Sequence, residues 1–214
     1  MALNAGKIRS IYSGSTARHY DLPITHFFSK YKKAAFDASG MKPGDRVLVF
    51  CCGTGLDFPH ILRKIGEDGE IVGVDFSSEM LARARARISR KNWANVTLIE
   101  ADVTKFAKTD NSFDVGVCTL GISIIPDYLA AYRALAACVK PGGEVIIGDM
   151  QLASGGFARL NPVTLFMAKR FGGSHQGHAN ARDLRGVMNA ELTDVRAEEF
   201  FLRSYYFCIG KKAP

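Results

Sequence analysis

A regular alternation of short apolar runs with helical segments, between residues 46 and 149, is the feature that most constrains how this chain can fold. Continuous apolar runs of strand length are typical of strands buried on both faces of a parallel sheet. Because strands that alternate with helices form parallel sheets with helices on both faces, ligands are expected outside the carboxyl ends of the strands. The predicted strands are residues 47–51, 71–75, 96–100, 113–118 and 144–148.

The segments on either side of this core complete the predicted fold. Residues 24–38 carry apolar side chains at a helical spacing, and Gly40 and Pro43-Gly44 end that helix. Residues 157–171 form an apolar, helical insert, and two further strand candidates follow at 196–203 and 205–209. We therefore predict a Rossmann-like three-layer α/β sandwich. Its sheet would be mostly parallel and seven-stranded, with an antiparallel C-terminal strand and an N-terminal helical cap.

Composition indicates a soluble globular protein and excludes several other classes. Hydrophobic residues make up 47% of the chain and charged residues 23%, and no apolar run is long enough for a membrane-spanning helix. The N-terminus lacks the apolar core of a secretory signal, so a cytoplasmic location is expected. The five cysteines form no CxxC pair, which favours free thiols in a reducing compartment and argues against a metal site.

The charge of the chain leaves two interpretations open. The net charge is +7, which suits either a solvated basic face or contact with an anionic membrane surface. Arg83, Arg87, Arg90 and Lys91 lie on one side of a predicted helix, as in a solvated face. Since the chain contains no nucleic-acid-binding motif, no nucleic-acid partner is expected.

Three features at the ends of successive predicted strands indicate a nucleoside site. The turn 51–55 has the sequence Cys-Cys-Gly-Thr-Gly, and its glycines allow a ligand to approach the backbone. Asp75 ends the next strand, where a carboxylate can accept the ribose hydroxyls. Asp102 follows the third strand, where it can accept a hydrogen bond from an adenine amino group or simply cap a helix. Phe58 stands where a dinucleotide site would carry its third glycine, which disfavours NAD.

These segments resemble the motifs of class I S-adenosylmethionine (SAM)-dependent methyltransferases. Residues 47–55 resemble the motif VLDxGCGTG, and residues 71–81 resemble the motif whose acid holds the ribose of SAM. Residues 101–103 and 139–143 are similar to the adenine-flanking segment and the LKPGG signature. A looser similarity, through Tyr20-Asp21 and residues 119–122, extends to the ubiquinone/menaquinone biosynthesis methyltransferases. Small enzymes that methylate phosphatidylethanolamine share the same core.

The resemblance implies SAM as cofactor, with S-adenosylhomocysteine as product. It also implies one domain over residues 1–214, with a helical cap (1–43), a SAM-binding core (44–150), an apolar insert or lid (151–195) and C-terminal strands (196–214). The cofactor-binding residues that follow from it are Cys51, Cys52, Gly53, Thr54, Gly55, Asp75, Phe76, Met80, Asp102, Val103, Cys118 and Thr119.

Two residues depart from the family pattern. Val49 stands where the family carries an acid that orients the amino end of SAM, and Cys51 stands at its first glycine. Asp57 either compensates for the missing acid or caps the following helix. Cys51 fits a tight turn provided that its backbone angles are ordinary. These departures leave open a noncatalytic SAM-binding protein.

Catalytic candidates are few, because methyl transfer mainly requires alignment of the reacting groups and exclusion of water. Tyr20 and His178 are the predicted catalytic residues, and His26 and His175 are further candidates. Tyr20 would lie in the cap, and the two later histidines would stand in a glycine-rich loop. Mobile polar lid residues, rather than a base or a metal pair, are the alternative for that loop.

The acceptor is predicted to be a small or lipidic molecule. If the apolar insert lines a pocket instead of packing on the sheet, a quinone-type ring or a phospholipid amine is favoured. The basic surface would then bring the enzyme, as a monomer or homodimer, to an anionic membrane. An RNA or protein methyltransferase is the remaining alternative, although residues 118–121 contain no NPPY-type acceptor motif.

Overall fold

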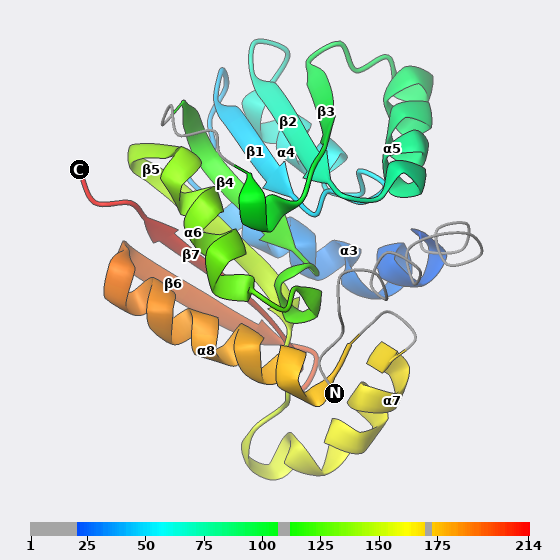
Figure 1. The fold of residues 1–214 in the computed structure, drawn as a ribbon, viewed down its shortest axis with the longest axis vertical. Coiled ribbons are helices and arrows are strands. Elements are labelled where there is room, and N and C mark those ends of the chain that lie inside the picture. The colour runs from blue at the N-terminus through cyan, green and yellow to red at the C-terminus, as the bar shows by residue number, and fades with distance from the viewer. Residues whose placement is uncertain (1–20, 107–111, 170–172) are drawn as a thin grey trace.

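The protein is described by a computed structural model that covers residues 21–106, 112–169 and 173–214 (Figure 1). Its core is a seven-stranded sheet in the order β3-β2-β1-β4-β5-β7-β6. The strands are β1 (Arg46–Phe50), β2 (Glu70–Asp75), β3 (Val96–Glu100), β4 (Phe113–Thr119), β5 (Val139–Met150), β6 (Thr193–Phe200) and β7 (Tyr205–Lys211). The α-helices are α3 (Asp21–Ala38), α4 (Phe58–Ile65), α5 (Ser78–Lys91), α6 (Tyr128–Cys138), α7 (Asn161–Lys169) and α8 (His175–Glu191), and the 3₁₀ helices are η1 (Val103–Lys105), η2 (Ile122–Ile124) and η3 (Gly155–Leu160).

The predicted fold class is confirmed. Strands β1 to β5 pair in parallel, while β7 pairs antiparallel with both β5 and β6. β7 is therefore the antiparallel strand, and β6 again runs in the direction of the first five. The strand order reverses between β1 and β4, which are hydrogen-bonded neighbours in the middle of the sheet.

Helices cover both faces of the sheet because its central strands are apolar on both sides. All side chains of β2 after Glu70 are buried, as are those of β1 after Arg46. One face packs against α3, α4 and α5 through a cluster that includes Phe36, Phe58 and Leu81. The other face packs against α6 and α8 (Figure 1).

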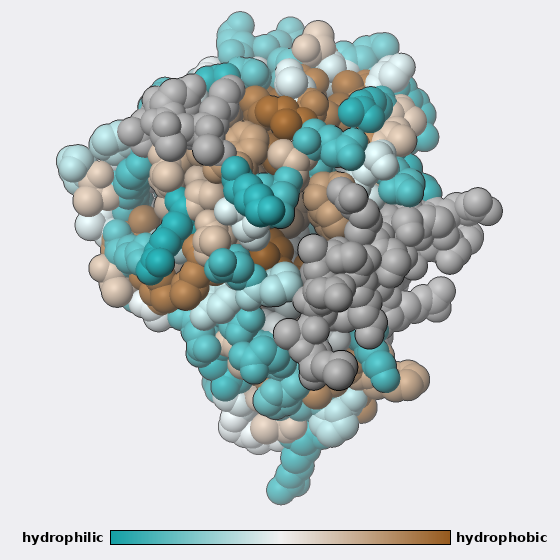
Figure 2. All heavy atoms as spheres, viewed as in Figure 1, coloured by the Kyte–Doolittle hydropathy of each residue, from teal (hydrophilic) through white to brown (hydrophobic). Residues whose placement is uncertain are grey.

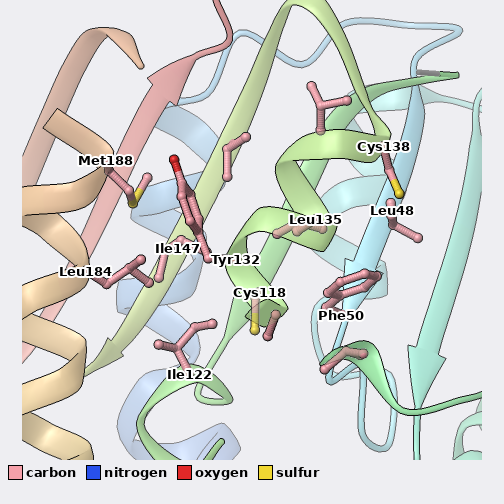
Figure 3. Close-up of a cluster of buried hydrophobic side chains, with 14 of the residues drawn as sticks. Leu48, Phe50, Cys118, Ile122, Tyr132, Leu135, Cys138, Ile147, Leu184 and Met188 are labelled. Carbon is pink, nitrogen blue, oxygen red and sulfur yellow. The ribbon is translucent and has the colours of Figure 1, made fainter. Parts of the chain in front are cut away.

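The core beneath α6 and α8 is a continuous hydrophobic cluster (Figure 3). Leu135 and Tyr132 of α6 and Leu184 and Met188 of α8 are completely buried against the sheet. The same cluster reaches Cys118 at the end of β4. This packing fixes the segments that follow β4 and β5, where the predicted site lies.

Three predicted elements differ from what the structure contains. One is the strand predicted at residues 196–203, which runs as β6 from Thr193 to Phe200 and is followed by a turn at 201–204. The segment holding His175 and His178 was predicted to be a glycine-rich loop, and this is wrong, because it forms the first turn of α8. The Ser174 hydroxyl accepts a hydrogen bond from the Gly177 backbone and caps that helix. β5 begins at Val139, five residues before the predicted start at 144, because Val139 pairs with Phe113 ahead of a register shift.

The described part of the predicted N-terminal cap is a layer of the sandwich. Ala35 and Phe36 of α3 are completely buried in the core, and Tyr31 packs on the rings of Phe200 and Tyr205. The helix predicted at residues 24–38 is thus confirmed, with its C-terminal half packed on the sheet.

Candidate active site

The predicted nucleoside residues come together at the carboxyl ends of β1 to β4. The turn 51–55 follows β1, Asp75 ends β2, Asp102 follows β3 and Thr119 ends β4. Since β1 and β4 flank the point where the strand order reverses, this edge of the sheet is the expected ligand-binding crevice.

The turn after β1 has a left-handed backbone at three positions. The φ angles of Cys51, Gly53 and Gly55 are 51°, 53° and 76°. The condition of ordinary backbone angles at Cys51 is therefore not met, and a non-glycine residue in this conformation costs about 1–2 kcal/mol. A Cβ atom on Gly55 would lie 2.6 Å from the ring of Phe58, so that position requires glycine. Cys51 therefore adopts a left-handed conformation that favours glycine, although it carries a side chain.

Asp75 holds the turn in place. Its Oδ2 accepts a hydrogen bond from the Gly53 backbone N–H at 2.8 Å, and its Oδ1 accepts one from the Ser77 backbone N–H at 2.9 Å. Burial raises the pKa of this carboxyl, while the backbone hydrogen bonds from Ser77 and Gly53 oppose that rise. Asp75 thereby joins the end of β2, the turn after β1 and the start of α5.

Arg87 supports the turn from the other side. Its Nε donates a hydrogen bond to the Thr54 carbonyl at 2.9 Å. The sequence assigned Arg87 to a solvated basic face, so this contact corrects that interpretation for one of its four members.

The remaining cofactor-binding candidates surround Asp75. The Met80 backbone N–H donates to the Ser77 hydroxyl, which caps α5, and the Met80 side chain is buried. Phe76 is half-buried between Asp75 and Ser77. Asp102 is exposed and accepts two hydrogen bonds from Thr104 on Oδ1, so it caps η1.

Beside Asp102, the chain turns back toward the core. The Ala101 backbone N–H donates to the Asp75 carbonyl at 3.0 Å, which keeps the end of β3 next to β2. Val103 packs into the cluster under α6. The start of η1 therefore borders both the crevice and the core.

The thiols of Cys51 and Cys52, in the turn after β1, have raised pKa values and stay protonated at neutral pH. A hydrogen bond to Cys118, followed by burial, raises the pKa of Cys51 well above its ordinary value. Burial, followed by the charges of Asp75 and Asp57, does the same for Cys52. All five cysteines are free, and no three His, Cys, Asp or Glu side chains in the described residues form a possible metal site.

Asp57 occupies the position just before α4 but its side chain does not cap the helix. Its Oδ1 lies 2.9 Å from the Lys32 ammonium of α3, and its Oδ2 accepts a hydrogen bond from the Thr119 hydroxyl at 2.5 Å. All three side chains are buried. The helix-cap interpretation of Asp57 is therefore wrong, and Lys32 is a buried charge beside it that the sequence did not indicate.

A second polar group lies on the opposite face of the sheet, under α8. Asp149 is buried at the end of β5 and accepts hydrogen bonds from the Ser123 backbone and hydroxyl at 2.8 and 2.7 Å. Burial raises the pKa of Asp149 to about 6 in spite of these bonds. A Cβ atom on Gly177 would lie 1.8 Å from the Ser123 carbonyl oxygen, so α8 packs directly on η2.

His178 is the one predicted catalytic residue that the structure describes in full. Its side chain is 1% exposed, and neither ring nitrogen has a hydrogen-bond partner among the described residues. Burial, followed by the charge of His175, lowers its pKa to about 4, so the ring is neutral at pH 7. Tyr20 lies outside the described residues, His26 is described only as part of the α3 backbone, and His175 is exposed.

The comparisons with known proteins agree with this geometry. Residues 47–143 match the family profile described as "Methyltransferase domain". The matched segment includes the glycine turn, Asp75, Asp102 and Thr119. Over 116 residues, which are 54% of this chain and 49% of the relative, the chain is 33% identical to a demethylmenaquinone methyltransferase of Bacillus mycoides. The chain thus spans about half the length of the curated relatives that it matches.

Solved structures share the fold of the methyltransferase domain at low sequence identity. One is phosphoethanolamine N-methyltransferase 2 of Haemonchus contortus, solved with phosphomonomethylethanolamine and S-adenosylhomocysteine. Its TM-score is 0.77 at 17% identity, over 97% of this chain and 60% of that chain. Another is an O-methyltransferase family protein of Burkholderia thailandensis, with a TM-score of 0.75 at 15% identity, over 100% of this chain and 64% of that chain.

Replacing Gly55 by alanine tests the conformation of the turn. We expect Gly55→Ala to lower the free energy of unfolding by about 2–5 kcal/mol, because the left-handed backbone and the Phe58 ring both resist a Cβ atom. Gly186→Ala is the matched control. Gly186 lies inside α8 with open space around its Cβ position, so alanine should stabilise the protein by about 0.5–1 kcal/mol. Urea unfolding measures the free energy of unfolding of both variants. The same change in both would contradict the described turn.

The lowered pKa of His178 predicts an acid-sensitive contribution to stability. The folded protein keeps the ring neutral down to about pH 4, whereas the unfolded chain binds a proton near pH 6.5. This contribution is complete above pH 6.5 and is lost as the pH falls from 6.5 to about 4. Asp149 acts in the opposite direction over nearly the same interval, because its pKa is raised.

A variant separates the two groups. Between pH 7.5 and pH 4.5, we expect the wild type to lose about 2–3 kcal/mol more unfolding free energy than His178→Gln, which does not titrate. Parallel pH curves for the two proteins would show that His178 is protonated alike in the folded and unfolded states.

Proposed function

We propose that this domain binds SAM across the carboxyl ends of its central strands and transfers the methyl group to a small or lipidic acceptor. The observation that carries the proposal is the pair of hydrogen bonds by which Asp75 ties the glycine turn to the start of α5. The match to a methyltransferase domain and the S-adenosylhomocysteine in a related fold support the same cofactor.

The residues at this edge fit an adenosine group. The two carboxylate oxygens of Asp75 have four lone pairs, and the backbone hydrogen bonds from Gly53, Ser77 and Phe76 leave acceptor capacity for the ribose. Both contacts of Asp102 with Thr104 use Oδ1, so Oδ2 is available for the adenine amino group. The glycines of the turn allow the ligand to lie against the backbone.

The bound cofactor supplies an electrophilic methyl group on a sulfonium sulfur. The task of the protein is to align the acceptor with that group and to exclude water. If the acceptor must lose a proton, the neutral and buried ring of His178 is our candidate for receiving it, with Tyr20 as the second candidate. An acceptor that is already nucleophilic needs neither.

Asp75→Asn tests the cofactor site. We expect it to weaken S-adenosylhomocysteine binding by at least about tenfold, because a hydrogen bond to a charged group contributes about 1.5–3 kcal/mol. Asp68→Asn, which neutralises an exposed acid in the turn before β2, should bind as the wild type does. Isothermal titration calorimetry with SAM and S-adenosylhomocysteine decides. If the wild type binds neither at millimolar concentration, the proposal fails, and if it binds without turnover, the noncatalytic alternative holds.

We favour a quinone-type ring or a phospholipid amine as acceptor. The relative from Bacillus mycoides is named for a demethylmenaquinone, and the structure from Haemonchus contortus was solved with a phosphorylated amine. Both classes suit a protein that works at a lipid surface. Extracted quinones and phospholipids, assayed with a labelled methyl donor, separate the two acceptors.

An exposed apolar surface supports contact with a membrane. It consists of η3, α7 and the β6–β7 turn, and Figure 1 shows α7 as a projection beyond the sheet. The apolar residues of this surface are Phe157, Leu160, Val163, Phe166, Phe201 and Leu202, which are 42–82% exposed. In α7 the small polar Thr164 is buried while Phe166 is 82% exposed, the reverse of an ordinary surface helix.

Basic residues accompany this surface. Arg159 and Lys169 are exposed on η3 and α7, and a Cβ atom on Gly155 would lie 4.0 Å from the Arg203 guanidinium. Figure 2 shows hydrophobic residues interspersed among hydrophilic ones on the face drawn there. Apolar side chains flanked by basic ones suit an anionic lipid interface. None of the helices in the described ranges is long and apolar enough to cross a bilayer.

Vesicle binding tests this contact. We expect the wild type to cosediment with vesicles that contain phosphatidylglycerol, and Phe166→Ser to reduce the partition constant by about tenfold or more, because burial of one phenylalanine contributes about 1.5–3 kcal/mol. Phe166→Trp is the control and should retain binding. Equal binding by the two variants would remove the surface from the proposal.

A further inference from the structure

The ion pair between Lys32 and Asp57 has no adequate structural explanation. Both residues are 5% exposed, and the pair connects α3 with the residue before α4. Buried ion pairs rarely stabilise a fold more than apolar residues of the same size would, because both charges lose their hydration. In the described residues, Asp57 is the one ionic or hydrogen-bonding partner of the Lys32 ammonium, which has three N–H donors.

A second buried group beside the pair also lacks a partner. The Tyr205 hydroxyl is completely buried and has no hydrogen-bond partner in the described part of the chain. It lies over Gly148, since a Cβ atom there would be 2.7 Å from the hydroxyl and 3.7 Å from the methyl group of Thr119. Thr119 in turn donates to Asp57. An unpartnered hydroxyl and an ammonium with spare donors both favour a ligand rich in hydrogen-bond acceptors.

The position of the pair relative to Asp75 indicates which part of a ligand it meets. The glycine turn connects the two carboxylates, because Asp75 accepts a hydrogen bond from Gly53 within it and Asp57 follows its last glycine by two residues. Asp75 ends β2, β1 leads into the turn, and Thr119 ends β4, in the order in which these strands lie in the sheet. A ligand with its ribose at Asp75 would therefore extend over the turn toward Asp57.

We propose that Lys32 and Asp57 together bind the zwitterionic amino-acid end of the cofactor, with Lys32 on its carboxylate and Asp57 on its ammonium group. This inference rests on the proposed function. An ion pair matched to a zwitterion adds no net charge to a buried site, which limits the desolvation cost. The pair would also replace the acid that the family carries at position 49. Val49 is completely buried in the apolar cluster under α3 and α4 and has no carboxylate.

A ligand series on the unaltered protein tests the inference without a mutation. S-adenosylhomocysteine carries the complete amino-acid end, its decarboxylated analogue lacks the carboxylate, and 5′-methylthioadenosine lacks both charged groups. Calorimetry should give affinities that fall in this order, with about a 10- to 100-fold loss when the carboxylate is removed. Equal affinity for all three would overturn the inference while leaving the nucleoside site intact.

Variants of Lys32 and Asp57 test whether these residues cause the differences in affinity. In Lys32→Met, the preference for S-adenosylhomocysteine over its decarboxylated analogue should disappear, while 5′-methylthioadenosine binds as before. The double variant Lys32→Met/Asp57→Asn removes both charges with little change in shape, so no unpaired charge is left in the core. It should bind the three ligands within about threefold of one another.

Lys33→Met is the matched control, because Lys33 is exposed on the same helix and paired with Asp37. It should preserve the full preference. A folded double variant that still prefers S-adenosylhomocysteine at least tenfold would overturn the assignment. Failure of the wild type to bind any of the three ligands would instead refute the proposed function itself.

Discussion

The carboxylate of Asp75 is the contact on which the site depends. It is covalently part of β2, and through two backbone N–H groups it holds the turn after β1 and the start of α5. Three elements that are separate in the sequence are thereby fixed around one buried acid. Its burial raises its own pKa, so the hydrogen bonds that keep it charged are also those that shape the turn.

The parallel core could be predicted because each of its strands is a short apolar run followed by a turn or cap residue. The strand-end acids Asp75 and Asp102 lie where the alternation of strands and helices placed them. These features depend on residues close together in the chain. The resemblance to methyltransferases added the cofactor, which no local pattern could specify.

The features that the sequence missed depend on contacts between distant segments. Lys32 and Asp57 lie 25 positions apart, and nothing in either neighbourhood indicates that α3 and α4 bring them together. The start of α8 reads as a loop because Gly177 and the histidines are poor helix formers. Burial of Ala181, Leu184 and Met188 and the cap by Ser174 outweigh those local preferences.

The place of β7 between β5 and β6 also limits the order in which the strands of the sheet can pair during folding. β6 precedes β7 in the chain, yet β7 is the strand that joins β6 to β5 and the rest of the sheet. Until β7 pairs, the open edge of β5 and the strand β6 both lack their partner. Because Tyr205 belongs to β7, its hydroxyl takes its place over Gly148 only when β7 pairs with β5.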